Sequence, residues 1–253
     1  MFDASWLFYL LLVVTGLIAG VINTLAGGGS NLTLPALMVM GLPADIANAT
    51  NRVGVLLQCL VGVKGFDKHN KLERGDIGPI LIPNLIGSGI GALFASFTPT
   101  TYLKPILLAA MVGMALIILI KPSTIAPQPG EPHRKVTFKS SAWWTLFIAG
   151  LYGGFVQAGV GFILIAALAG GLRYDLVRAN ALKMLCTGVL TALALVIFIW
   201  RDQVLWVPGL VLAVGTMIGA QLGVKLALKV SQNTLKWFLF VMTLAASAAA
   251  LLF

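Results

Sequence analysis

The sequence predicts an all-α polytopic membrane protein made of two inverted repeats, each a broken-helix hairpin followed by three transmembrane helices. Three observations predict this fold: an apolar composition, a series of long apolar segments, and an internal duplication. Hydrophobic residues form 59% of the 253-residue chain, charged residues form 10%, and the mean hydropathy is +0.98. A soluble core does not bury so much apolar sequence, so the chain is expected to lie in a lipid bilayer.

Long apolar segments follow one another along the chain, and each approaches the ~20 residues that cross a bilayer. The first of them lacks a basic leading region and runs directly into a glycine cluster, so we expect it to be retained rather than removed as a signal peptide. The expected spans cover residues 6–26, 46–63, 77–97, 103–120, 176–200, 205–228 and 237–253.

Two further apolar segments, 32–41 and 162–171, are too short to span. At ~1.5 Å per residue each reaches about half of a ~30 Å hydrocarbon core. Each is therefore expected to pair with the preceding segment as a hairpin that returns to its starting side.

A proline-rich linker divides the chain into two halves of similar sequence. We expect a first transmembrane repeat at 1–120, a cytoplasmic basic linker at 121–141 and a second repeat at 142–253. The sequence GLIAGVIN from Gly16 matches GLYGGFVQ from Gly150, and GSGIGA from residue 87 matches GTMIGA from residue 215. These offsets of 134 and 128 residues indicate a duplication with small insertions.

Charge sets the expected orientation. The formal net charge is +9, and Lys and Arg gather in the loops 64–74 and 121–139, which the positive-inside rule places in the cytoplasm. The turn near Pro99 has no base before Lys104 and is expected outside, whereas its counterpart at 225–229 is basic. The halves are therefore expected to be inverted, with both termini outside. The bases are spread over short loops with little aromatic sequence between them, which argues against a nucleic-acid partner.

The sequence AGGGSNLTLPALMVM, at 26–40, interrupts the first hairpin with glycine and polar residues. Backbone groups that are unpaired at membrane depth persist only where protein surrounds them or where they line a water-filled cavity. Transporters bind their substrates at such places. Ser30 and Asn31 are expected to cap a helix whose free N–H groups attract an anion. The three glycines allow left-handed backbone and close approach of a ligand. Glycine pairs at small-xxx-small spacing are instead expected to pack helices together: Gly16/Gly20, Gly87/Gly91, Gly150/Gly154 and Gly219/Gly223.

The second half carries a degenerate version of this motif. It reads QAGVGF, so that Gln157 replaces Asn23 and only Gly159 and Gly161 remain to open the backbone. We expect a weaker break there and a smaller contribution to binding.

Arg52 and Lys183 each follow a small polar sequence about one turn into a membrane helix. No Asp or Glu lies deep in an expected span, so the usual carboxylate for proton or sodium coupling is missing. A cavity with bases and helix N-termini but no acids favours an anionic substrate. In the alternative interpretation the two bases snorkel to the interface or pair with Asp45 and Asp175.

The candidate substrate-binding residues are Asn23, Gly27, Gly28, Gly29, Ser30, Asn31, Thr50, Asn51, Arg52, Gln157, Gly159, Gly161, Asn180 and Lys183. The sequence has no Walker loop, HExxH, CxxC or nucleophile elbow, which argues against an ATP-driven pump or a hydrolase. We therefore expect no enzyme activity, no catalytic residue, no cofactor and no metal site.

The stretch GVINTLAGGGSNLTLPALMVMGLPADIANATN, residues 20–51, resembles the signature of the sulfite exporter TauE/SafE family, also called the toluene sulfonate uptake permease family. The length of the chain, its twofold repeat and its basic central loop also agree with this resemblance. The resemblance implies a multi-pass protein of the bacterial or archaeal cytoplasmic (inner) membrane that carries a sulfur-containing anion such as sulfite, thiosulfate or an organosulfonate. A homo-oligomer is compatible with it.

We therefore expect a secondary transporter, in the simplest case an exporter, that moves the anion by alternating access. With the cell interior negative, each expelled charge gains ~2.3 kcal/mol per 100 mV. Two alternatives stay open: an anion channel, which would share the bases and the lack of acids, and a non-transporting membrane scaffold subunit, which would explain the glycine pairs alone. The sequence leaves the anion, the direction of transport and any coupling ion undetermined.

Overall fold

The computed structural model describes residues 6–120, 134–138, 140–231 and 234 of the chain. These residues form helices and turns, with no strand among them. The expected spans at 77–97 and 176–200 match helices to the residue, and the expected span at 237–253 and both termini lie outside the described residues. The elements are α1 (Trp6–Leu25), α2 (Ser30–Val39), α3 (Ala44–Lys68), η1 (Arg74–Asp76), α4 (Ile77–Phe97), α5 (Thr100–Ile120), α6 (Ser141–Phe155), α7 (Val160–Ile165), the π-helical turn η3 (Ala166–Gly171), α8 (Leu176–Trp200) and α9 (Trp206–Lys229).

In the part of the chain that the structure describes, five helical stretches are long and apolar enough to cross a membrane: α1, α3, η1 with α4, α8 and α9. They present large apolar side chains outwards. Phe94, Trp200 and Val207, for example, are 65%, 71% and 60% exposed. In water such a surface would be costly, whereas lipid tails match it, so the chain is a multi-pass membrane protein.

Both expected hairpins are present, and their breaks are equally long. Residues 26–29 separate α1 from α2, and residues 156–159 separate α6 from α7. The prediction of a weaker second break is therefore wrong. The physical reason lies in Gln157, which itself takes a left-handed conformation with φ 65°. Its side chain is held at both ends by hydrogen bonds, to Asn51 and to Thr191, so this break does not depend on a glycine triplet.

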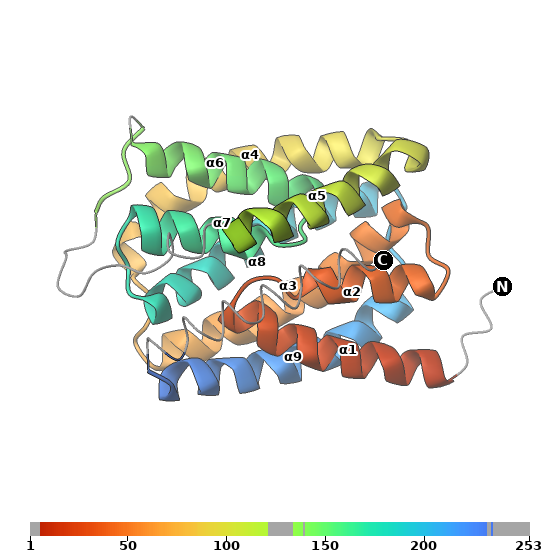
Figure 1. Ribbon diagram of the computed structural model, residues 1–253, viewed down its shortest axis with the longest axis horizontal. Helices are drawn as coiled ribbons and strands as arrows, with labels where there is room; N and C mark the ends of the chain where they lie inside the picture. The colour runs from red at the N-terminus through yellow and green to blue at the C-terminus, as the bar shows by residue number, and fades with distance from the viewer. Residues whose placement is uncertain (1–5, 121–133, 139, 232–233, 235–253) are drawn as a thin grey trace.

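The backbone repeats between the halves. Left-handed residues occur at Gly27 and Gly159, at Gly41 and Arg173, and at Asn70 and Asp202, and the members of each pair are 132 residues apart. In Figure 1, α1 starts at the right-hand end and α6 at the left-hand end, so these two helices run in opposite directions.

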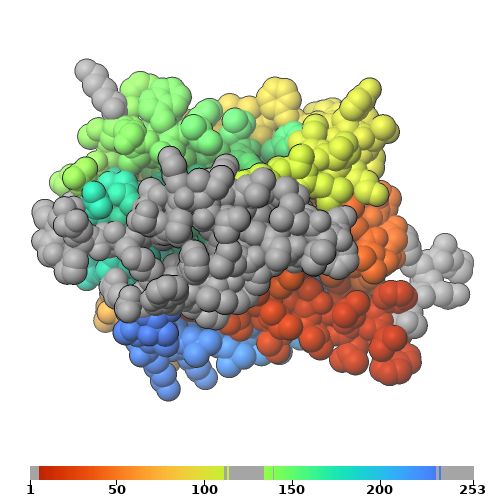
Figure 2. Space-filling model, in the orientation of Figure 1, coloured from red at the N-terminus to blue at the C-terminus, as the bar shows by residue number. Residues whose placement is uncertain are grey.

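The glycine pairs pack helices together, as expected. α1 lies against α9 and α4 lies against α6 (Figure 1). A Cβ added at Gly16 would lie 2.7 Å from the Leu212 carbonyl oxygen, and one at Gly150 would lie 2.1 Å from the Asn84 carbonyl oxygen. Only glycine permits such backbone contact. Each half thus lies against the other, and Figure 2 shows blue α9 residues beside red α1 residues along one edge.

α3 is longer than the expected span at both ends. It continues to Lys68, so the basic loop expected at 64–74 is helical in its first part. Phe66 explains the extension, because it is fully buried and fills the core from this last part of the helix. Because α3 starts at Ala44, Arg52 lies more than two turns inside it, deeper than the one turn that we expected.

Candidate functional site

The tips of the two hairpins touch each other at the centre of the molecule. Gly27, with φ 99°, packs on Gly161, and a Cβ added at Gly27 would lie 2.4 Å from the Gly161 Cα. A Cβ at Gly28 would lie 2.7 Å from the Phe162 ring. The first hairpin therefore meets the second through bare backbone and one aromatic ring. We call this contact the hairpin crossing.

The glycine triplet differs in detail from the expectation. Of its three members only Gly27 has a positive φ. Ser30 and Asn31 are not caps, because α2 begins at Ser30 and its N-cap is Gly29, without a side-chain cap bond. The reason is that the Ser30 hydroxyl accepts a hydrogen bond from Asn51 on another helix. The amides of residues 28–30 donate to no described residue, so the start of α2 keeps free N–H groups.

Asn51 of α3 joins both hairpins. Its Nδ2 donates to Ser30 Oγ (3.1 Å) and to Gln157 Oε1 (3.3 Å), and its Oδ1 accepts from Thr33 Oγ1 (2.5 Å). Gln157 Nε2 donates onward to Thr191 Oγ1 of α8 (2.8 Å). A continuous polar network therefore crosses the centre of the bundle. The sequence motifs pointed to Asn51 and Gln157, but they did not single out Thr33 or Thr191.

Arg52 holds the end of the opposite hairpin helix. Its guanidinium donates to the carbonyl oxygens of Gly153 (3.1 Å) and Gly154 (2.6 Å), and it lies 4.8 Å from the centre of the Phe198 ring. These carbonyls belong to the last turn of α6, where a helix carries partial negative charge. A residue of the first half thus offsets the partial negative charge at the end of the broken helix in the second half.

Lys183 makes the reciprocal contact. Its ammonium donates to the carbonyl oxygens of Asn23 (2.7 Å) and Thr24 (2.9 Å) at the end of α1, and to Asn180 Oδ1 (2.8 Å). All three N–H groups of this ammonium are used. Lys183 and Arg52 are nearly or fully buried, at 1% and 0% exposed.

The alternative pairing with acids is not found. No ion pair within the described part of the chain joins Arg52 to Asp45, and the Asp45 Oδ1 atom has no hydrogen-bond partner there. Asp175 instead caps α8, accepting from the amides of Val177 and Arg178. The physical reason is depth: both bases lie about two turns inside their helices, within reach of helix-end carbonyls rather than of the acids at the helix starts.

Most of the remaining candidates surround this centre. Asn180 holds Lys183, and Asn31 is 6% exposed with its Oδ1 atom unpartnered by any described group. Asn23 contributes its backbone carbonyl. Gly159 forms the left-handed start of α7. Thr50 is the exception, because its hydroxyl faces away and accepts from the Leu205 amide at the start of α9.

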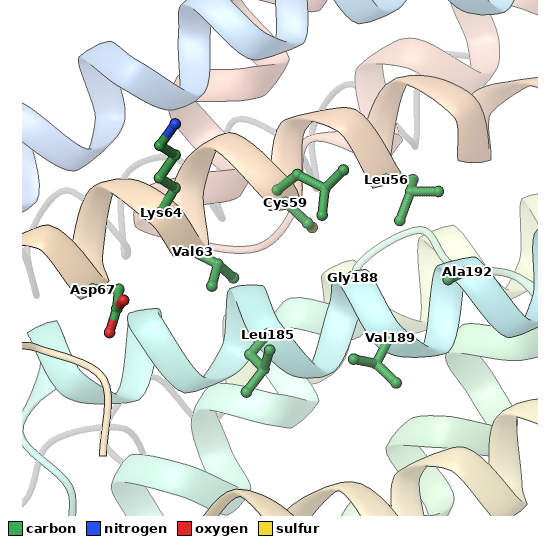
Figure 3. A pocket seen from close by; sticks show the side chains of 10 residues that line it. Leu56, Cys59, Val63, Lys64, Asp67, Leu185, Gly188, Val189 and Ala192 are labelled. Atoms are coloured by element: carbon green, nitrogen blue, oxygen red, sulfur yellow. The ribbon is translucent and has the colours of Figure 1, made fainter. Parts of the chain in front are cut away.

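Every candidate residue is buried, so the polar centre is not exposed to solvent. A cavity of about 360 Å³ lies elsewhere, between α3 and α8 (Figure 3). Its lining is mostly apolar, including Val63 and Leu185, with Lys64 and Asp67 at one end. This cavity includes no candidate residue.

Polar contacts also join the halves at one end of the bundle. Arg178 of α8 pairs with Glu73, before η1, at 2.5 Å, and the Tyr174 hydroxyl donates to Asp76. Burial, together with this hydrogen bond, raises the pKa of the Tyr174 phenol above its ordinary value, so the phenol stays a donor at neutral pH. We call these contacts the end latch.

The fold and this centre define a multi-pass membrane protein in which two broken hairpins enclose a buried polar cluster. The family model described as sulfite exporter TauE/SafE matches residues 12–250, and the chain belongs to this family. Family membership identifies it as a membrane transporter.

Three curated relatives have similar length. A "Probable membrane transporter protein" of Haemophilus influenzae is 26% identical over 240 residues, which cover 94% of this chain and 92% of the relative. "Probable membrane transporter protein ORF9" of Sinorhizobium sp is 25% identical, covering 92% and 88%. "Probable membrane transporter protein YfcA" of Escherichia coli (strain K12) is 26% identical, covering 99% and 92%.

Proposed function

We propose that the protein is a secondary transporter that exports a small sulfur-containing anion, such as sulfite, thiosulfate or an organosulfonate, by alternating access. The family name supports the substrate class. The observation that carries the mechanism is the reciprocal contact of Arg52 with the end of α6 and of Lys183 with the end of α1. We place the protein in the bacterial or archaeal inner membrane, with the repeats 1–120 and 142–253 inverted around the linker.

The anion would bind at the hairpin crossing. The free amides at the start of α2 suit an oxyanion, since helix N-termini carry partial positive charge. Asn31 and Asn51 supply amide groups beside them, and Arg52 adds a full charge. The Arg52 Nε atom has no partner among the described residues and is a donor that the anion could use.

Burial of every candidate residue favours a carrier over an open channel. The Phe162 ring lies on Gly28 and covers the first hairpin tip. Access from one end would require movement of one hairpin relative to the other, since the crossing consists of packed backbone. No carboxylate lies in the polar network, so export driven by the membrane potential needs no coupling ion.

The test uses the purified protein in liposomes. Vesicles are loaded with unlabelled sulfite, and entry of labelled sulfite against its gradient is measured; thiosulfate, sulfoacetate, sulfate and acetate are compared in parallel. A carrier saturates with sulfite concentration and shows counterflow. Flux that rises linearly without counterflow would identify a channel instead.

Thermal unfolding gives an independent measurement of binding. A ligand at 100 times its Kd stabilises the folded state by about 2.7 kcal/mol, so the transported anion should raise the unfolding temperature selectively. If neither counterflow nor a selective shift occurs with any sulfur anion, the proposed substrate class is wrong.

A further inference from the structure

Two buried polar side chains outside the hairpin crossing have no hydrogen-bond partner among the described residues. Asn84 of α4 is 0% exposed, and neither its Nδ2 nor its Oδ1 atom bonds to any described residue. Thr187 of α8 is 3% exposed, and its hydroxyl is likewise unpartnered in the described part of the chain. A buried polar group without a hydrogen bond is destabilising, and most such groups in proteins have a partner. The presence of two such side chains therefore needs an explanation.

The two side chains lie at the same level of neighbouring helices. Ser88 of α4 donates to the Leu190 carbonyl oxygen of α8 (3.0 Å), and the Ser96 carbonyl oxygen accepts from Gln203 beyond the end of α8 (3.4 Å). α4 and α8 therefore run in the same direction. Asn84 lies one turn before Ser88, and Thr187 lies one turn before the residues beside Ser88.

This level adjoins the polar network of the crossing. Thr191, one turn after Thr187, accepts from Gln157, which in turn bonds to Asn51. In the other direction, α4 and α8 lead to the end latch at Asp76 and Tyr174. Asn84 and Thr187 thus stand between the crossing and one end of the bundle.

The fold itself does not require an amide at position 84. The carbonyl oxygen of Asn84 contacts Gly150 of α6, and the carbonyl oxygen of Leu212 makes the same contact with Gly16 of α1. Leu212 is therefore the counterpart of Asn84 in the other half, and it is fully buried in an apolar cluster. A leucine fills this position in one half, whereas the other half keeps a polar side chain that no described residue partners.

We propose that Asn84 and Thr187 form a second, uncharged subsite for the transported oxyanion, on its route between the hairpin crossing and the end latch. This inference rests on the proposed function. The amide N–H and the hydroxyl would donate to oxygens of a sulfur oxyanion. Neutral donors bind an oxyanion more weakly than a base does, which suits a position that the anion must leave.

The experiment compares Asn84→Leu and Thr187→Val with wild type in liposomes, using saturable uptake of labelled sulfite and thermal unfolding without anion. Each variant removes hydrogen-bond donors and keeps the number and branching of the side-chain heavy atoms. We expect the apparent sulfite affinity to fall roughly tenfold or more in each, as for a lost hydrogen bond to a charged group. Asn84→Leu should unfold at the same or a higher temperature, because it removes an unpartnered amide. Ser88→Ala is the matched control, since the Ser88 hydroxyl is already bonded to Leu190, and it should keep wild-type sulfite affinity.

Wild-type sulfite affinity in both variants, with raised stability of Asn84→Leu, would overturn the subsite and leave the proposed function intact. If Asn84→Leu does not fold, the isosteric Thr187→Val decides alone. If the wild-type protein transports neither sulfite nor thiosulfate, the proposed function fails and the subsite fails with it.

Discussion

Arg52 and Lys183 show what a single residue does in this protein. From sequence, both could be identified as bases inside membrane helices, and the absence of carboxylates deep in the expected spans predicted an unusual role. Their actual partners could not be predicted, because these are backbone carbonyls more than 100 residues away. The contacts stabilise two interrupted helices whose last carbonyls would otherwise lie unpaired at membrane depth. Whether either base also touches the anion stays a prediction.

We predict that Arg52→Met destabilises the protein by about 1.5–3 kcal/mol, the range for a hydrogen bond to a charged group. Asp45→Asn should not rescue it, because the two side chains are not paired. In a double-mutant cycle measured by unfolding in detergent, the coupling energy between the positions should stay below about 0.5 kcal/mol. Restored stability in the double variant would show that Arg52 and Asp45 interact after all.

At the level of elements, the hairpins were the most predictable feature. Segment length alone separated the short helices from the spanning ones, and the glycine triplet located the first break within a residue. The N-cap of α2 is Gly29, one residue before the expected Ser30. The Ser30 side chain bonds to Asn51 of α3 rather than to the backbone of α2. The strength of the second break was underestimated for the same reason: Gln157 is fixed by side chains from distant segments, which local sequence does not reveal.

The two adjacent glycines at the first tip should respond differently to alanine. Gly27→Ala combines a positive φ with contact against the Gly161 backbone, so we predict a loss of more than about 1 kcal/mol in folding stability and loss of sulfite counterflow. Gly28→Ala meets only the edge of the Phe162 ring, which can move, and should cost less. Gly28→Ala combined with Phe162→Leu should recover the difference. Equal effects of the two single variants would show that the crossing is not packed as described.

The end latch should hold one end of the bundle closed without adding much stability. The Arg178 and Glu73 side chains are 41% and 33% exposed, so their ion pair contributes at most about 1 kcal/mol. We predict that Glu73→Gln combined with Tyr174→Phe speeds backbone hydrogen exchange at 172–176. The loop 201–205, at the end of α8, is the internal control. Unchanged exchange at 172–176 would mean that other contacts keep this end closed.

On the scale of the whole molecule, the duplication predicted that backbone features recur between two parts of the chain, as the left-handed residues do, but not how these parts fit together. α1 lies against α9 and α4 against α6, so each half covers the broken helix of the other. Small-xxx-small spacing indicated that these glycines meet another helix without indicating which one. The partners follow from three-dimensional complementarity of backbone surfaces, and the polar centre exists only after both halves have interlocked.

The inverted orientation can be tested at the two equivalent left-handed turns. Asn70 follows α3 and Asp202 follows α8, and both have φ 53°, so they are counterparts in the two halves. In inverted repeats these turns must face opposite sides of the membrane. We predict that an impermeant maleimide added to intact cells labels Asp202→Cys and spares Asn70→Cys until the membrane is opened, in a background where Cys59 and Cys186 are replaced. Both native thiols are fully buried, so their removal should change the surface little. Labelling of both positions from the same side would exclude the inverted arrangement and, with it, alternating access by exchange of two equivalent halves.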